Sequence, residues 1–85
     1  MSKTSVPVAA TIPLSRVAVG APRMVVEVAD RVRDDLEHEG LFPGTVVVVS
    51  TRTPLGGPVI VGLGGTRIAL SMDVAGCVLT VAVPA

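Results

Sequence analysis

The sequence predicts a mainly β domain with short helices, folded as a small, partly open barrel. Valine dominates a chain that is 49% hydrophobic, and β-branched residues favour strands. Nine glycines and seven prolines divide the apolar sequence into short segments separated by tight turns. Its 85 residues are enough for one domain. Rolling valine-rich strands into a barrel also hides edges that would otherwise promote aggregation.

The N-terminal region, residues 1–13, has the composition of a flexible leader, and residues 14–85 are expected to form the domain. A single lysine and an apolar stretch interrupted by Pro7 and Pro13 make a poor secretory signal. No apolar run approaches the 20 or so residues that a membrane-spanning helix needs. The one cysteine allows no internal disulfide. We therefore expect a cytoplasmic protein without a membrane span.

A strand followed by a helix is predicted at residues 23–39. Residues 23–29 alternate so that Met24, Val26 and Val28 would share one face of a strand. Asp30 is expected to cap the helix that follows, because its carboxylate can accept from a free backbone N–H.

The end of this helix is well marked. Gly40 stands at the expected stop, where a left-handed backbone costs glycine little. Leu36 and Leu41 are spaced for the hydrophobic contact of a Schellman cap. Pro43 prevents the helix from restarting, and Pro43-Gly44 indicates a turn.

The C-terminal half reads as four short strands joined by tight turns. A loop is expected at residues 53–58, where Gly56 and Gly57 permit positive φ, and Gly64-Gly65 indicates a two-residue hairpin. Ser71 is placed to cap a single helical turn that Gly76 ends. The strands are expected at residues 45–51, 59–63, 66–70 and 77–83.

Charge and composition argue against nucleic-acid binding and against catalysis. Seven basic residues balance seven acidic ones, and Phe42 is the only aromatic residue, so there is neither a basic stripe nor a base-stacking platform. The chain has one histidine, no Cys–His pair in sequence and no phosphate-binding loop ending in Lys-Ser or Lys-Thr. We predict that the protein is not an enzyme.

Metal binding has one candidate cluster, on the charged helix. Imidazole and carboxylates are good ligands for first-row metals, and Asp34 and His38 are four residues apart on one helix face, with Glu37 beside them. The simpler interpretation is a solvated acidic face, with His38 complementing the helix dipole. The lone Cys77 is expected to be a small buried apolar residue rather than a reactive or metal-bound thiol.

The loop at residues 53–58 is the candidate partner-binding site. Leu55 is an apolar residue held between the turn residues Pro54, Gly56, Gly57 and Pro58. The loop is either a plain connection or a contact site, since rigid scaffolds often carry function on loops. An apolar side chain at a constrained tip can anchor a partner.

The order of these signals resembles the FeoA family, across nearly the whole chain. The resemblance begins with Leu14-Ser15 and Val19-Gly20, continues through the helix end and the following turn, and includes the loop at residues 53–58. The residues that carry it are Leu36, Gly40, Leu41, Pro43, Gly44, Pro54, Gly56, Gly57, Pro58, Gly65, Arg67, Ala69, Leu70 and Ala75.

The resemblance implies an SH3-like barrel and a role in ferrous iron transport. By analogy, the protein would be a cytoplasmic accessory protein that binds the cytoplasmic region of a FeoB-type ferrous iron transporter and modulates it. The alternative is a transition-metal sensor or carrier that binds ferrous iron or another divalent metal through the acidic helix. The same fold occurs in iron-dependent repressors, but this chain has no DNA-binding domain. Self-association into a homo-oligomer is a third hypothesis.

Overall fold

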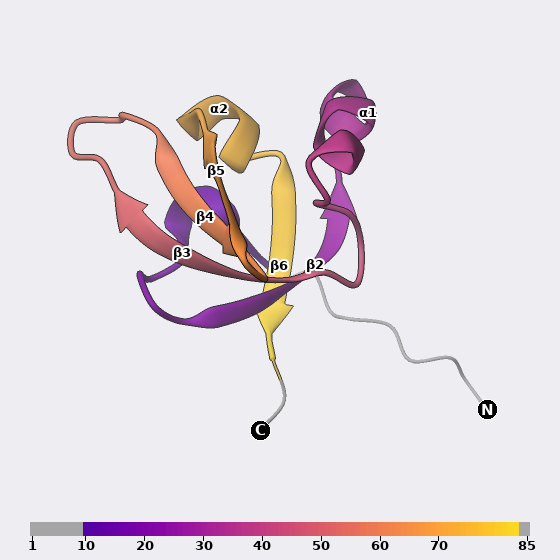
Figure 1. The fold of residues 1–85 in the computed structure, drawn as a ribbon, viewed down its shortest axis with the longest axis horizontal. Coiled ribbons are helices and arrows are strands. Elements are labelled where there is room, and N and C mark those ends of the chain that lie inside the picture. Colours follow the sequence, from indigo (N-terminus) through magenta and orange to yellow (C-terminus); the bar gives the residue numbers. More distant parts are fainter. Residues whose placement is uncertain (1–9, 84–85) are drawn as a thin grey trace.

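The computed structural model describes residues 10–83 and contains one six-stranded antiparallel sheet with two short α-helices (Figure 1). The elements in chain order are β1 (Ile12–Pro13), the 3-10 helix η2 (Leu14–Arg16), β2 (Pro22–Val28), α1 (Asp30–His38), β3 (Val46–Arg52), β4 (Val59–Leu63), β5 (Thr66–Leu70), α2 (Met72–Ala75) and β6 (Val78–Ala82).

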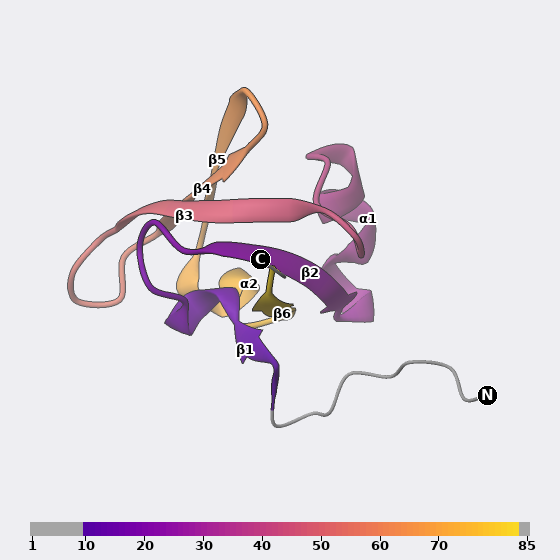
Figure 2. The ribbon, with the colours of Figure 1, turned by 90° about the horizontal axis from the view of Figure 1, so that it is seen from below.

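The strand order β1-β6-β2-β3-β4-β5 leaves β1 and β5 as the two edges of the sheet. The sheet therefore curls without closing, which confirms the predicted partly open barrel. Seen from below in Figure 2, β2 and β3 lie side by side, whereas the β4–β5 hairpin turns away from them. Irregular pairing between Val25 and Glu27, and again between Val49 and Thr51, accompanies this curvature, because a bulge bends a strand and increases its twist.

The sheet begins two residues before the predicted domain boundary at Leu14. Ile12 pairs with Thr80 and Pro13 with Leu79, which makes β1 a short edge strand on β6. The buried Thr80 hydroxyl donates to the Ile12 carbonyl oxygen at 2.7 Å and accepts from Nε of Arg23 at 3.1 Å. These contacts fasten β1 to the barrel. The first nine residues of the predicted leader lie outside the described residues.

The β2 strand departs from the predicted alternation. Met24, Val26 and Val28 were expected on one face, but the buried positions are Val25 and Val28. The bulge after Val25 explains the change, because one extra residue shifts the strand from one face to the other.

The helix α1 begins one residue earlier than predicted and ends where expected. Ala29 is the N-cap and makes no side-chain capping bond, so Asp30 is the first helical residue instead of the cap. Gly40 has φ +90°, its N–H donates to the Glu37 carbonyl, and the Leu41 N–H donates to the Leu36 carbonyl at 2.8 Å. This pair of bonds is the Schellman motif, which confirms the predicted helix end.

The remaining predicted turns are present in the structure. The N–H of Thr45 donates to the Phe42 carbonyl across Pro43-Gly44, and Leu63 pairs with Thr66 across the Gly64-Gly65 turn. The Ser71 hydroxyl accepts from the Val74 N–H at 3.2 Å and caps α2, as predicted.

Buried aliphatic side chains from strands β2 to β6 fill the barrel. Val32 and Leu36 are the buried residues of α1 and attach this charged helix to the core. Within residues 10–83, no helix is long and apolar enough to cross a membrane. The buried apolar residues are Leu14, Val17, Val25, Val28, Val32, Leu36, Leu41, Val47, Val49, Val59, Val61, Leu70, Ala75 and Val78.

Candidate functional site

The loop at residues 53–58 connects β3 to β4 and presents Leu55 at its tip. The Leu55 side chain is fully exposed, at 104% of its reference area, and its φ is +62°. Gly56 follows with φ +80°, and the Gly57 N–H approaches the Pro54 carbonyl at 3.4 Å. Two successive positive φ values at the central residues are those of a type I′ turn, which here forms the tip of the loop.

The backbone of this loop differs from the prediction in one respect. Both glycines were expected to permit positive φ, but the left-handed pair is Leu55 and Gly56. Gly57 has a different role, since a Cβ there would lie 2.5 Å from Cγ2 of Thr53. The loop therefore needs glycine at position 57, because a side chain there would clash with Thr53. Leu55, by contrast, adopts a backbone conformation that is unfavourable for leucine. Among residues 10–83, Leu55 is the only residue other than glycine with positive φ.

The acidic helix does not assemble the candidate metal site. Nδ1 of His38 donates to the backbone carbonyl oxygen of Asp34 at 2.7 Å, which leaves Nε2 as the nitrogen available to a ligand. In the part of the chain that the structure describes, no three His, Cys, Asp or Glu side chains come together as a metal site. Asp34, Glu37 and His38 are thus three exposed side chains of one helix and do not form a ligand cage.

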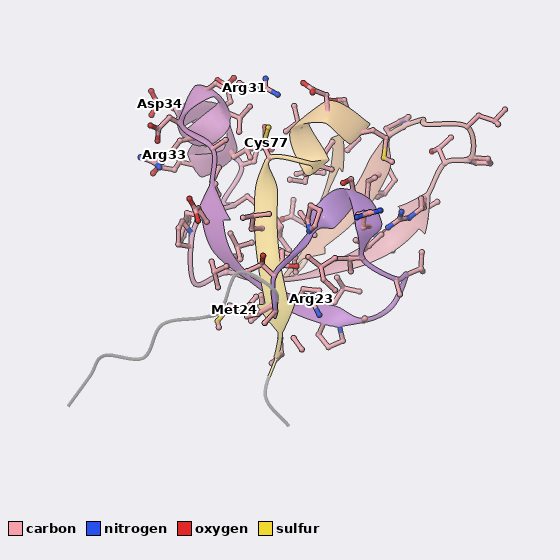
Figure 3. The ribbon with its side chains drawn as sticks, turned by 180° about the vertical axis from the view of Figure 1, so that it is seen from behind. Arg23, Met24, Arg31, Arg33, Asp34 and Cys77 are labelled. Carbon is pink, nitrogen blue, oxygen red and sulfur yellow. The ribbon has the colours of Figure 1, made fainter. Side chains whose placement is uncertain are left out.

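Cys77 is half-buried, contrary to the prediction of a fully buried residue. Figure 3 shows it between the two helices, below Arg31. Nη2 of Arg31 lies 3.1 Å from its sulfur and 2.8 Å from Oδ2 of Asp73. The hydrogen bond and charge of Asp73 raise the pKa of Arg31. This contact joins α1 to α2 across the end of β6, and because Arg31 and Asp73 are exposed, it contributes little to stability.

A groove that the sequence did not predict lies between α1 and the edge strand β5. Its volume is about 400 Å³, and α2 borders one end. Asp35 and Glu39 form part of the helical wall, and Arg67 lies on the strand wall. None of these three charged side chains makes a hydrogen bond or ion pair within residues 10–83. The other residues that line the groove are Val32, Leu36, Ile68, Ala69, Leu70, Ser71 and Val74.

Only part of this groove could be anticipated from the sequence. Five acidic and two basic residues between positions 30 and 39 predict an acidic face. The sequence does not show that this face lies opposite Thr66–Leu70, because only the curvature of the folded sheet brings α1 close to β5.

These features define a small open β-barrel module with an exposed apolar loop and a charged groove, without an assembled metal centre in residues 10–83. The chain belongs to the FeoA domain family, whose match covers residues 12–81. This match confirms the resemblance derived from the sequence. No curated protein matches the chain.

Solved structures support the same assignment. An iron uptake regulatory protein, FeoA, is 33% identical, with a TM-score of 0.77, and the alignment covers 86% of this chain and 97% of that one. The FeoA of Stenotrophomonas maltophilia, solved in complex with zinc and described as a prokaryotic SH3 domain protein, is 27% identical with a TM-score of 0.70. That alignment covers 81% of this chain and 88% of that one. The predicted SH3-like fold is therefore confirmed.

The fold also occurs in a larger protein. A manganese-dependent transcriptional repressor is 16% identical with a TM-score of 0.79, and the alignment covers 86% of this chain but 42% of the repressor. At this identity the likeness concerns the fold alone.

Proposed function

We propose that this protein is a non-enzymatic accessory protein of ferrous iron transport. It acts in the cytoplasm, binds the cytoplasmic region of a FeoB-type transporter and modulates its activity. Membership of the FeoA family supports the link to ferrous iron transport. The description of the Stenotrophomonas relative as a candidate ferrous iron transport activating factor supports a transporter as the partner.

Leu55 is the observation that supports a partner-binding loop. Its side chain buries nothing in the barrel, yet its backbone takes a conformation that glycine or asparagine would adopt at lower cost. Strained backbone positions concentrate at functional sites, where the strain is part of how a side chain is presented. The loop at Pro54, Leu55, Gly56, Gly57 and Pro58 therefore presents Leu55 as an apolar anchor for the transporter.

A binding assay with matched variants tests this proposal. The tagged full chain is immobilised and its affinity for the cytoplasmic domain of the host's ferrous iron transporter is measured, with and without ferrous iron. Leu55→Asp should weaken binding by about tenfold or more, the effect of losing an anchor residue. Phe42→Asp is the control, because Phe42 is a half-exposed apolar residue in the loop at the other end of β3.

The outcomes separate the parts of the proposal. Loss of binding in Leu55→Asp alone supports the loop as the contact. Equal binding by Leu55→Asp and the wild type, with both variants folded, would assign the contact to another surface. Failure of the wild type to bind the transporter domain in either condition would refute the adaptor role itself.

Metal sensing or carrying is the second proposal, and the zinc complex of the Stenotrophomonas relative favours testing it. The described residues do not fit a preassembled cage, so His38 would supply Nε2 at the exposed end of α1, with Asp34 and Glu37 as further donors. Calorimetry with ferrous iron, manganese and zinc should show a smaller heat for His38→Ala than for the wild type. Equal heats would refute the role of the helix.

A further inference from the structure

The two edges of the open sheet differ in how well they are protected. β1 has only two residues, and Pro13 has no N–H to donate. Short strands and prolines are devices that prevent an edge from pairing with another chain. β5 has five residues and no proline, and within residues 10–83 no strand pairs with its outer side. The edge at β5 is therefore available for pairing.

The register of the β4–β5 hairpin identifies which backbone groups are free. Leu63 and Thr66 flank the two-residue turn, and such flanking residues exchange hydrogen bonds. Because bonded and non-bonded pairs alternate, Ile68 and Leu70 also bond to β4, whereas Arg67 and Ala69 direct their backbone N–H and C=O groups away from it. Two donors and two acceptors thus face outward along this edge.

The helix α1 stands opposite this edge without covering it. Native proteins often shield an edge strand by packing a helix over it. Here the groove of about 400 Å³ separates α1 from β5 instead. Val32 and Leu36 line the groove from α1 but are almost fully buried, so its accessible apolar surface comes from the half-buried Ile68 and Val74 and the exposed Ala69. A strand rises about 3.3 Å per residue, so a segment of about five residues matches the length of β5.

The charges of the groove determine the chemistry of the segment that fits it. Asp35 and Glu39 are four residues apart, on one face of α1, and both are exposed and without an ion-pair partner in the described residues. Arg67 is the one basic residue in the lining. The acidic residues of the helical wall favour lysine or arginine in the ligand, and the half-buried Ile68 and Val74 favour aliphatic side chains at the alternate positions, which point to the opposite face of the added strand.

We propose that this groove binds an extended, basic and apolar segment of a partner protein, which adds a strand to the free edge of β5. In this mode, backbone hydrogen bonds supply affinity, and the side chains that alternate toward the helix supply specificity. The surface is separate from the loop that carries Leu55, and the inference does not rest on the identity of the partner.

A titration of the ¹⁵N-labelled full chain with a blocked KVKVK peptide tests the proposal by nuclear magnetic resonance. The peptide should shift the amide signals of Arg67 and Ala69 and slow their hydrogen exchange, and should also shift signals of α1 around Asp35. A blocked EVEVE peptide of the same length is the control. It should bind at least about fivefold more weakly, because it places like charges against Asp35 and Glu39.

Three variants separate edge pairing from simple charge attraction. Ala69→Pro removes an outward N–H that takes no part in the β4–β5 ladder, and should weaken KVKVK binding by about tenfold. Ala69→Val keeps that N–H while also enlarging the side chain, so the loss of affinity in Ala69→Pro beyond that in Ala69→Val measures the contribution of the missing donor. Asp35→Lys combined with Glu39→Lys changes only two exposed positions, one in α1 and one at its C-cap, and should weaken KVKVK binding by about fivefold or more while restoring EVEVE binding.

Several results would overturn the inference. These are no shift at millimolar KVKVK, shifts confined to the β1 edge, equal affinity for the two peptides, or unchanged affinity in a folded Ala69→Pro variant. A dimer of the peptide-free protein that Ala69→Pro dissociates would also overturn it, because the occupant of the edge would then be a second copy of the chain.

Discussion

Replacing Leu55 by asparagine should stabilise the protein, although Leu55 is apolar and asparagine is not. The left-handed backbone costs an ordinary residue about 1–2 kcal/mol. At φ +62° Leu55 carries this cost, and its fully exposed side chain offsets none of it by burial. Asparagine adopts this region several times more readily than most residues. We therefore expect Leu55→Asn to raise the free energy of unfolding by about 0.5–1 kcal/mol, or the melting temperature by about 3–6 °C.

Two further substitutions of Leu55 make the reasoning quantitative. Leu55→Ala keeps the same backbone cost and loses no buried surface, so its unfolding free energy should stay within about 0.5 kcal/mol of the wild type. Leu55→Gly relieves the strain but adds freedom to the unfolded chain, so it should stabilise less than asparagine does.

Urea unfolding, followed by circular dichroism, gives these differences from one series of curves. The same variants are then assayed for binding to the transporter domain. The reasoning predicts opposite changes in Leu55→Asn, namely higher stability and weaker binding, as expected where strain serves function. A folded Leu55→Asn variant that is no more stable than Leu55→Ala would refute the account of strain in this loop.

Three further changes test the barrel itself by urea unfolding. Thr80→Val removes the buried hydroxyl that holds β1 and should lower the free energy of unfolding by about 1–3 kcal/mol. The exposed control Thr66→Val should change it by less than about 0.5 kcal/mol. Equal effects of the two variants would contradict the role of the hydroxyl. Gly40→Ala should cost about 1 kcal/mol because of its φ of +90°, and a neutral result would argue against the left-handed helix end. Leu36→Ala should lower the free energy of unfolding by about 2–4 kcal/mol because it leaves a cavity in the core. The exposed control Glu37→Ala should change it little. A small loss of stability in Leu36→Ala would mean that α1 packs loosely on the core.

The features that the sequence predicted well are those that neighbouring residues determine. Gly40 and Leu41 fix the helix end through bonds to the preceding turn, and Ser71 caps α2 through a bond three residues away. The Gly64-Gly65 hairpin is equally local. Interactions over such short distances along the chain leave direct signals in the sequence.

The features that it missed depend on residues far apart in the chain. The bulge that moves Val25 into the core appears where β2 pairs with β6, some 50 residues later. Cys77 precedes β6 and lies beside Arg31 of a different element, where its side chain is only half-buried. The local sequences around Val25 and around Cys77 contain neither piece of information, so the predicted face of β2 and the predicted full burial of Cys77 were both wrong.

The candidate functional sites were likewise predicted only in part. The loop carrying Leu55 was placed correctly because prolines and glycines mark it, but its left-handed leucine was not foreseen. The candidate donors Asp34, Glu37 and His38 were placed on one exposed helix, yet side chains on one helix surface point outward and need a second element to close a metal site. The groove was missed because it requires knowing that β5 ends the sheet beside α1.

The loop that carries Leu55 lies on the side of α2 away from α1 in Figure 1, and it shares no residue with the groove. Their contributions to binding should therefore be separable, since the effects of independent sites add. If one partner contacts both, the two contacts act at a high effective concentration, and losing either would weaken binding by more than the isolated contact is worth. If the groove and the loop serve different partners, Leu55→Asp and Ala69→Pro would each abolish one interaction and leave the other unchanged. Measuring both variants against the transporter domain and the KVKVK peptide distinguishes these arrangements, because only a shared partner makes transporter binding sensitive to Ala69→Pro.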